Sequence, residues 1–220
     1  MDAITKDRLL KTADRYAQQG KFDSAIVEYR KVARADPDDL TVANTLGDLY
    51  LRQGRAHEAT QHFARVAERL VADGLHVRAI AMYKKIAKLE PDNVDLQMRL
   101  GELFAQQNLI GEARQQYTTV AEALRRKGDT REALKLYKRS AELDPTHVKS
   151  RVALAQQYAS EGMQSEASES FRAAGQECLR KGLTEEAVVN FQKALDLKPE
   201  SRPALKALAE AYATTGDVQK

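Results

Sequence analysis

The sequence predicts an all-α protein built as a helical-repeat solenoid, and two observations support this prediction. One nine-residue motif occurs four times, and its closing proline recurs every 54 residues: YRKVARADP at 29–37, YKKIAKLEP at 83–91, YKRSAELDP at 137–145 and FQKALDLKP at 191–199. Between these motifs, apolar residues recur three and four positions apart, as on one face of an α-helix, and no useful length alternates with the period of a strand. Each repeat of such a chain packs on its neighbours, so chain length counts repeats rather than domains.

The first two helices are expected at 4–19 and 22–35. Gly20 ends the first, because glycine adopts the left-handed conformation without a steric penalty. The second carries an apolar stripe around Tyr29 and stops before Pro37, since the residue preceding proline is disfavoured in the helical region. The connection between them is short, which makes the two helices antiparallel neighbours.

A third helix is expected at 40–53, between the capping residue Asp39 and Gly54. Inside it, Gly47 has no side chain, and its absence permits a neighbouring helix to approach closely. The start of the chain is therefore helix, short turn, helix, Asp-Pro turn, helix.

These residues resemble the tetratricopeptide repeat, a two-helix unit of about 34 residues. The pattern G-x-F-x-x-A-x-x-x-Y-x-x-x-A-x-x-x-P, followed by L-G-x-x-Y, is carried by Gly20, Phe22, Ala25, Tyr29, Ala33, Pro37, Leu46, Gly47 and Tyr50. The usual tryptophan is missing, with Leu9 and Ala43 in its place. The resemblance implies a right-handed solenoid of antiparallel helices that binds a peptide or protein.

The chain departs from the plain repeat after the third helix. The helix at 56–72 ends at Gly74 without a proline turn, and it acts both as second helix of the pair begun at 40 and as first helix of the pair ending at Pro91. The unit is thus three helices in 54 residues, and about 12 helices are expected in all: 4–19, 22–35, 40–53, 56–72, 75–89, 94–107, 110–126, 129–143, 148–161, 164–181, 184–197 and 202–215. We expect one domain with units at 1–37, 38–91, 92–145 and 146–199 and a partial unit at 200–220.

A three-helix unit leaves two arrangements of the surface open. If helices simply alternate between two layers, the surface repeats every second unit. If the unit has its own three-helix packing, as in armadillo-like repeats, the surface repeats with every unit. The helices at 40–53, 94–107, 148–161 and 202–215 keep one apolar pattern, which favours the second arrangement.

By resemblance to the family, the partner-binding side chains would lie on the polar faces of the first helices of the units. These candidates are Asn44, Asp48, Arg52, Met98, Arg99, Glu102, Gln106, Val152 and Gln156. The alternative is a plain solvent-facing surface. A clamp for a C-terminal carboxylate, which some members of the family hold with Lys, Asn and Arg, is absent, because the matching positions are Thr41/Thr45, Asp95/Arg99 and Lys149/Ala153.

The bulk composition excludes several classes of function. A net charge of +3, from 35 basic and 32 acidic residues, gives no electrostatic footprint for nucleic acid. The single cysteine, Cys178, forms no intrachain disulfide, and no apolar stretch approaches the ~18 residues of a membrane span. The N-terminus has charged residues where a signal peptide needs an apolar run, so we expect a cytoplasmic protein without membrane insertion.

No group of side chains predicts catalysis, a metal or a cofactor. His57, His62, His76 and His147 form no metal-ligand pattern and are expected at the surface or in turns, and Cys178 is expected to be buried as a small apolar residue. Recurrent first-turn acids (Glu58, Glu112, Glu166) and basic helix ends (Arg125, Arg126, Lys127, Arg180, Lys181) complement the helix dipole. Phosphate loops and nucleophile elbows are missing from the sequence.

Three functions remain as hypotheses. The first is a non-catalytic interaction scaffold that binds a peptide or protein. The second is a regulatory or adaptor arm of a larger bacterial-type signalling, secretion or motility assembly protein, and the third is a nucleic-acid-binding helical repeat, which the acidic groove candidates oppose. The sequence stops where a further helix would begin, so the 220 residues are expected to be the N-terminal part of a longer array, unless 202–215 is itself the capping helix.

The repeated motif places Tyr137 between helices, and this placement predicts a large stability effect. Tyr137→Ala is expected to cost about 3–5 kcal/mol in the free energy of unfolding, as for other buried aromatic truncations. Chemical denaturation measures it, and a loss below about 1 kcal/mol would contradict the placement.

Overall fold

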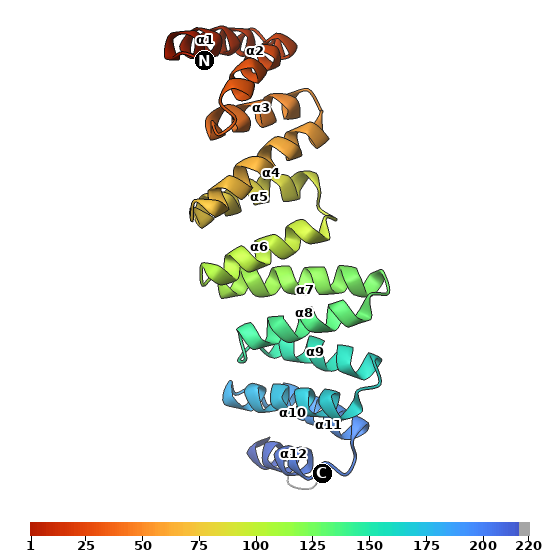
Figure 1. Cartoon of the computed structure of the whole chain (residues 1–220). Helices are drawn as coiled ribbons and strands as arrows, with labels where there is room; N and C mark the ends of the chain where they lie inside the picture. Colours follow the sequence, from red (N-terminus) through yellow and green to blue (C-terminus); the bar gives the residue numbers. More distant parts are fainter. Residues whose placement is uncertain (216–220) are drawn as a thin grey trace. The chain divides into compact units, whose positions relative to one another are not determined.

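The computed structural model of the chain describes residues 1–215, which form twelve α-helices and no strand (Figure 1). Their bounds are α1 Ala3–Gln18, α2 Phe22–Ala35, α3 Leu40–Arg52, α4 Ala56–Ala72, α5 His76–Leu89, α6 Val94–Gln106, α7 Ile110–Arg126, α8 Thr130–Leu143, α9 Val148–Ser160, α10 Gln164–Arg180, α11 Thr184–Leu197 and α12 Arg202–Thr215. The predicted all-α fold is confirmed, and each helix boundary agrees with the sequence prediction within one residue.

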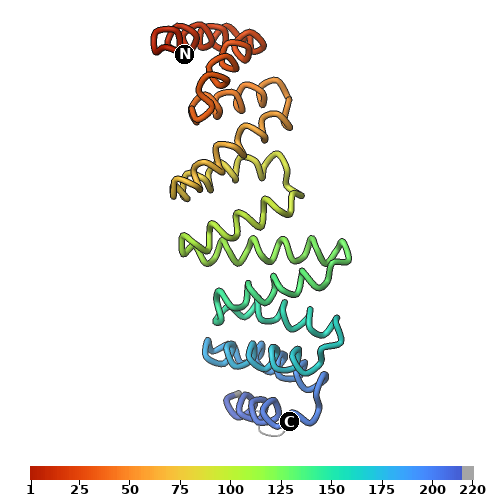
Figure 2. Tube along the Cα trace, viewed as in Figure 1, coloured from red at the N-terminus to blue at the C-terminus, as the bar shows by residue number. Residues whose placement is uncertain are grey.

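The chain divides into two compact units, Met1–Leu96 and Gln97–Lys220, with the boundary inside α6. In the first unit, α1 packs on α2, and α4 packs on both α3 and α5. In the second, α7 packs on α8, and α10 packs on both α9 and α11, so one central helix serves two partners as predicted. The chain reverses direction at each turn (Figure 2). The expectation of a single solenoid domain stays a prediction.

Left-handed residues end the helices where the sequence places glycine. Gly20, Gly54, Gly74, Gly128, Gly162 and Gly182 all have positive φ, between 72° and 86°. At the position that corresponds to Gly54 and Gly162, the chain carries Asn108, with φ 57°. Asparagine adopts this conformation more readily than other side chains that carry a Cβ. The turn predicted at Gly216 lies outside the described residues.

The proline turns at Pro37, Pro91 and Pro145 lead into helices with side-chain caps. Asp39 Oδ1 accepts a hydrogen bond from the backbone N–H of Val42 at 3.0 Å, and Asn93 Oδ1 accepts one from Leu96 at 3.0 Å. At the third such position, His147 Nδ1 accepts from the backbone N–H of Ser150 at 3.2 Å. Each cap satisfies one of the unpaired donors at a helix start.

Gly47 is the point at which α3 meets the ring of Phe63 on α4. A Cβ at Gly47 would lie 2.5 Å from the ring, a distance that no real contact allows. Gly101 has the same relation to Tyr117, at 2.8 Å. The prediction that Gly47 permits close approach is therefore confirmed.

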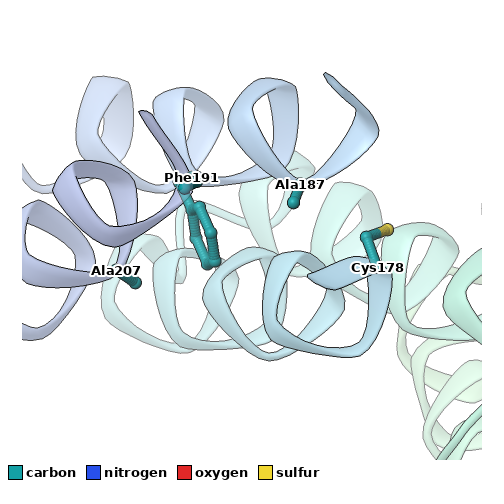
Figure 3. Close-up of a cluster of buried hydrophobic side chains, with 5 residues drawn as sticks. Cys178, Ala187, Phe191 and Ala207 are labelled. Atoms are coloured by element: carbon teal, nitrogen blue, oxygen red, sulfur yellow. The ribbon is translucent and has the colours of Figure 1, made fainter. Parts of the chain in front are cut away.

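Aromatic rings and small residues form the core. Tyr137 is only 5% exposed, as predicted, and Phe63 and Phe191 are fully buried. Cys178 is also fully buried, in a cluster with Ala187, Phe191, Ala207 and Ala211 (Figure 3). Burial raises the pKa of its thiol, so its predicted role as a small apolar residue is confirmed.

The close contact at Gly47 predicts that Gly47→Ala destabilises the first unit. The added methyl must displace the buried Phe63 ring, and overpacking of this kind costs about 1–3 kcal/mol, reduced by up to about 1 kcal/mol of gained helix propensity. Gly111→Ala is the matched control, because a Cβ there meets nothing within 4 Å. Urea denaturation is expected to show a lower midpoint for Gly47→Ala and an unchanged or higher one for Gly111→Ala, and equal midpoints would disprove the contact.

The cap at His147 makes the stability of α9 dependent on pH. Burial, followed by the charge of Arg114, holds the pKa of His147 below its ordinary value. The cap requires the neutral ring, because only a neutral ring nitrogen can accept from Ser150. The folded pKa is lower than the unfolded value of about 6.5, so this contribution is complete above that pH and is lost as the pH falls through the folded pKa. His147→Asn, which copies Asn93, is expected to flatten the acid side of the denaturation-midpoint profile. An identical profile for wild type and variant would contradict the assignment.

Candidate functional site

Within the compact part Met1–Leu96, side chains of α3 and α5 meet above an aromatic ring of α4. Lys85 Nζ lies 3.0 Å from Asp48 Oδ1 and 3.3 Å from Asn44 Oδ1, and Asn44 Nδ2 donates to Asp48 Oδ2 at 3.2 Å. The same ammonium lies 4.6 Å from the centroid of the Phe63 ring. The candidates Asn44 and Asp48 are therefore brought together, and their polar groups are occupied within the chain.

The corresponding side chains of α9 and α11 line an open groove of about 470 Å³. From α9 it takes the candidates Val152 and Gln156, together with Lys149 and Ala153. From α11 it takes Glu185, Glu186, Val189 and Lys193. Val189 is 48% exposed, which is high for an aliphatic side chain and gives the groove an accessible apolar wall. We call this feature the α9–α11 groove.

As between α3 and α5, a lysine of the third helix lies above an aromatic ring of the middle helix, here α10, but this lysine has no carboxylate partner in the described chain. Lys193 Nζ is 5.7 Å from the centroid of Phe171. Among residues 1–215, Lys193 makes no ion pair, because Gln156 stands where α3 has Asp48. The polar arrangement that is closed between α3 and α5 is thus open between α9 and α11.

The middle set of candidates lies on α6. Glu102 accepts from the Arg99 guanidinium at 3.2 Å, and Met98 is half-buried. From α8, Arg139 lies 4.9 Å from the centroid of the Tyr117 ring, the third cation above a central ring. Tyr117 is fully buried, and its hydroxyl has no hydrogen-bond partner in the described chain.

Two candidates lie apart from these groups. Arg52 is exposed and lies 5.8 Å from the ring of Phe22 on α2, rather than against α5. Gln106 is exposed near the end of α6. Arg52 therefore contacts the second helix rather than the third, whereas no contact of Gln106 with a third helix is shown and its role stays a prediction.

The sequence prediction missed the side chains that the third helices contribute. Lys85, Arg139 and Lys193 each follow the motif's aromatic residue by two positions, in YKK, YKR and FQK. The signal was therefore present in the repeated motif. The recurrence of a cation above a ring in successive units favours a surface that repeats with every unit.

Other site chemistry is sparse in the described part of the chain. No group of three His, Cys, Asp or Glu side chains within residues 1–215 could hold a metal ion. None of the helices described is long and apolar enough to cross a membrane. The histidines differ from the sequence prediction at one position, because His62 is half-buried and stacks on the Tyr50 ring at 5.3 Å between centroids.

Family models match the chain in four places. A model described as TPR repeat matches residues 13–54, and models described as tetratricopeptide repeat match 70–126, 120–149 and 173–201. Together they cover more than half of the chain. Among curated proteins, no sequence matches.

Solved structures of several helical-repeat proteins align with most of the chain. A tetratricopeptide repeat protein from Parabacteroides merdae is 15% identical, with 95% of this chain and 99% of that chain covered and a TM-score of 0.29. The MamA protein is 21% identical, with 96% and 94% covered and a TM-score of 0.24. The TPR domain of P58(IPK) is 14% identical, with 98% and 67% covered and a TM-score of 0.27. The family assignment depends on the four family models.

Proposed function

Because the chain belongs to the tetratricopeptide repeat family, we propose that it is a non-catalytic scaffold that binds a peptide or protein through the first and third helices of its units. Repeats of this family generally mediate protein–protein interaction. The surface that best supports the proposal is the α9–α11 groove. Val152 and Gln156, which line this groove, are the residues that we expect to contact the partner.

The comparison between units indicates the chemistry of that partner. Between α3 and α5, Asp48 supplies a carboxylate to Lys85 above the Phe63 ring. In the α9–α11 groove the cation Lys193 is present, but Gln156 stands at the position of Asp48 and supplies no carboxylate. A partner that brings its own carboxylate completes the same arrangement.

The walls of the groove favour an aliphatic side chain beside that carboxylate. Val152, Ala153 and Val189 provide apolar lining, and burying it against a partner is favourable in proportion to the area removed from water. Glu185 and Glu186 line the α11 wall about two turns before Lys193, and Lys149 lines the α9 wall, so the groove carries charges of both signs. The groove therefore suits a segment with an acidic residue next to an aliphatic one, and with its acidic side towards Lys193.

Site-specific crosslinking tests whether this groove contacts a protein. A photo-crosslinking amino acid in place of Gln156 is expected to capture a partner from native extract, whereas the same group in place of Glu169 is not. Glu169 is exposed on α10 and does not line the groove. Equal capture at both positions, or capture of nucleic acid alone, would argue against the proposal.

A second variant tests the chemistry rather than the location. Gln156→Asp copies Asp48 and is expected to pair with Lys193 inside the chain, which weakens partner binding about fivefold, the range of an exposed ion pair. Glu169→Gln is the control and is expected to leave the affinity unchanged. Unaltered affinity in Gln156→Asp would show that the partner does not use Lys193.

A further inference from the structure

A second groove, of about 440 Å³, lies among α2, α3 and α4 of the first unit. Four arginines line it, Arg30 and Arg34 from α2, Arg55 from the turn before α4, and Arg65 from α4. The carboxylate in its lining is that of Glu58. A chain with a net charge of only +3 therefore gathers a local excess of positive charge here, and we call this feature the arginine groove.

Two of the four guanidinium groups have partners inside the chain. Arg55 Nη2 lies 2.6 Å from Glu58 Oε1, and Arg65 donates to the backbone carbonyl of Pro37. Arg30 and Arg34 make no hydrogen bond or ion pair within residues 1–215. The groove thus presents two guanidinium groups whose donors are available to a ligand.

The repeat does not require this concentration of charge. Arg30 and Arg34 are four residues apart on α2, where like charges are neighbours and destabilise the helix. Two units later, the corresponding residues are Lys138 and Glu142, which form an ion pair at 4.0 Å. One unit later the corresponding residues are Lys84 and Lys88, again a like-charge pair, so the same framework folds with either combination, and Arg34 in the last turn of α2 also complements the helix dipole. What distinguishes Arg30 and Arg34 is that they share a groove with further arginines.

The rings of Tyr50 and His62 line the bottom of the arginine groove. Tyr50 is 5% exposed, stacks on His62 and carries the Arg55 guanidinium 4.6 Å from its ring centroid. Burial, followed by the charges of Arg65 and Arg30, holds the pKa of His62 below its ordinary value. His62 lines the same groove as the arginines of α2 and α4, so these cations surround one half-buried ring.

We propose that the arginine groove binds a phosphate group, held by Arg30 and Arg34 against the ring of His62. A guanidinium fork matches two phosphate oxygens at once, and it keeps its charge at all physiological pH values. A dianion between the two α2 arginines also relieves their mutual repulsion. The phosphate belongs either to a small free anion or to a phosphorylated side chain, and the test separates these sources.

The first experiment follows the four histidine ring signals by NMR during addition of inorganic phosphate, pyrophosphate or a short phosphoserine peptide at constant ionic strength. A bound dianion offsets the nearby positive charges, so the His62 signals are expected to shift and the pKa of His62 to rise. His57, His76 and His147 do not line the groove and report on non-specific effects of salt.

The second experiment uses a pair of charge-matched variants. Arg34→Glu copies the neutral pair of α8 and is expected to weaken phosphate binding at least about tenfold. It is also expected to raise the urea midpoint of the ligand-free protein, because a like-charge pair becomes an ion pair. Lys88→Glu makes the same charge change at the corresponding position of α5, outside the groove, and is expected to change binding less than about twofold.

The outcomes separate the sources and can overturn the proposal. A shift of His62 with inorganic phosphate or pyrophosphate identifies a free anion as sufficient, whereas a shift with the phosphopeptide and not with its unphosphorylated form or the free anions identifies a phosphorylated partner. Unmoved His62 signals with all three probes would refute the site. Equal weakening by Arg34→Glu and Lys88→Glu would reduce the effect to net charge and also refute it.

Discussion

The aromatic ring at the centre of each three-helix unit is the contact on which the rest of the structure depends. Phe63, Tyr117 and Phe171 each come from the middle helix, and at the first two a glycine of the preceding helix lies against the ring. Close packing of this kind fixes the distance between two helices, because interiors are dense and tolerate little added volume. The third helix then adds a cation above the same ring. The ring therefore sets both the core of a unit and the floor of its surface.

A constant floor allows the chemistry above it to change from unit to unit. The residues at the corresponding positions of the first helices are Asn44 and Asp48 on α3, Met98 and Glu102 on α6, and Val152 and Gln156 on α9. On α3 they satisfy the cation internally. On α9 they supply lining to a groove instead, and within the described chain Lys193 makes no ion pair with them. Specificity can thus be altered by substitutions that do not disturb the packing underneath.

The positions of the charged residues say more about binding sites in this chain than its net charge does. The near balance of 35 basic and 32 acidic residues argued against a nucleic-acid footprint. Ion pairs at helical spacing recur along the described chain, as in Arg55 with Glu58 or Lys138 with Glu142, and exposed pairs of this type add little stability. Arg30 and Arg34 are different, because their like charges face a groove with further arginines. A local departure from charge pairing, rather than net charge, marks the second candidate site.

The sequence by itself determined the helices, their ends and the repeat. These features depend on interactions within a few residues: glycine or Asn108 in the left-handed conformation, the cap at Asp39, and the apolar stripe of each helix. The burial of Tyr137 and Cys178 also followed, since a repeated motif gives each position the environment of its equivalents.

Tertiary structure decided which side chains form the sites. Lys85 meets Asp48 across 37 residues of chain, and Arg34 shares a groove with Arg65 from another helix. Such partners depend on how helices are rotated and spaced around the central ring, which periodicity does not specify. For that reason the sequence prediction missed the third-helix cations Lys85, Arg139 and Lys193, and it did not foresee that Arg52 lies against Phe22 on α2. The sequence fixes local geometry through short-range contacts, while recognition surfaces arise from residues that only packing brings together.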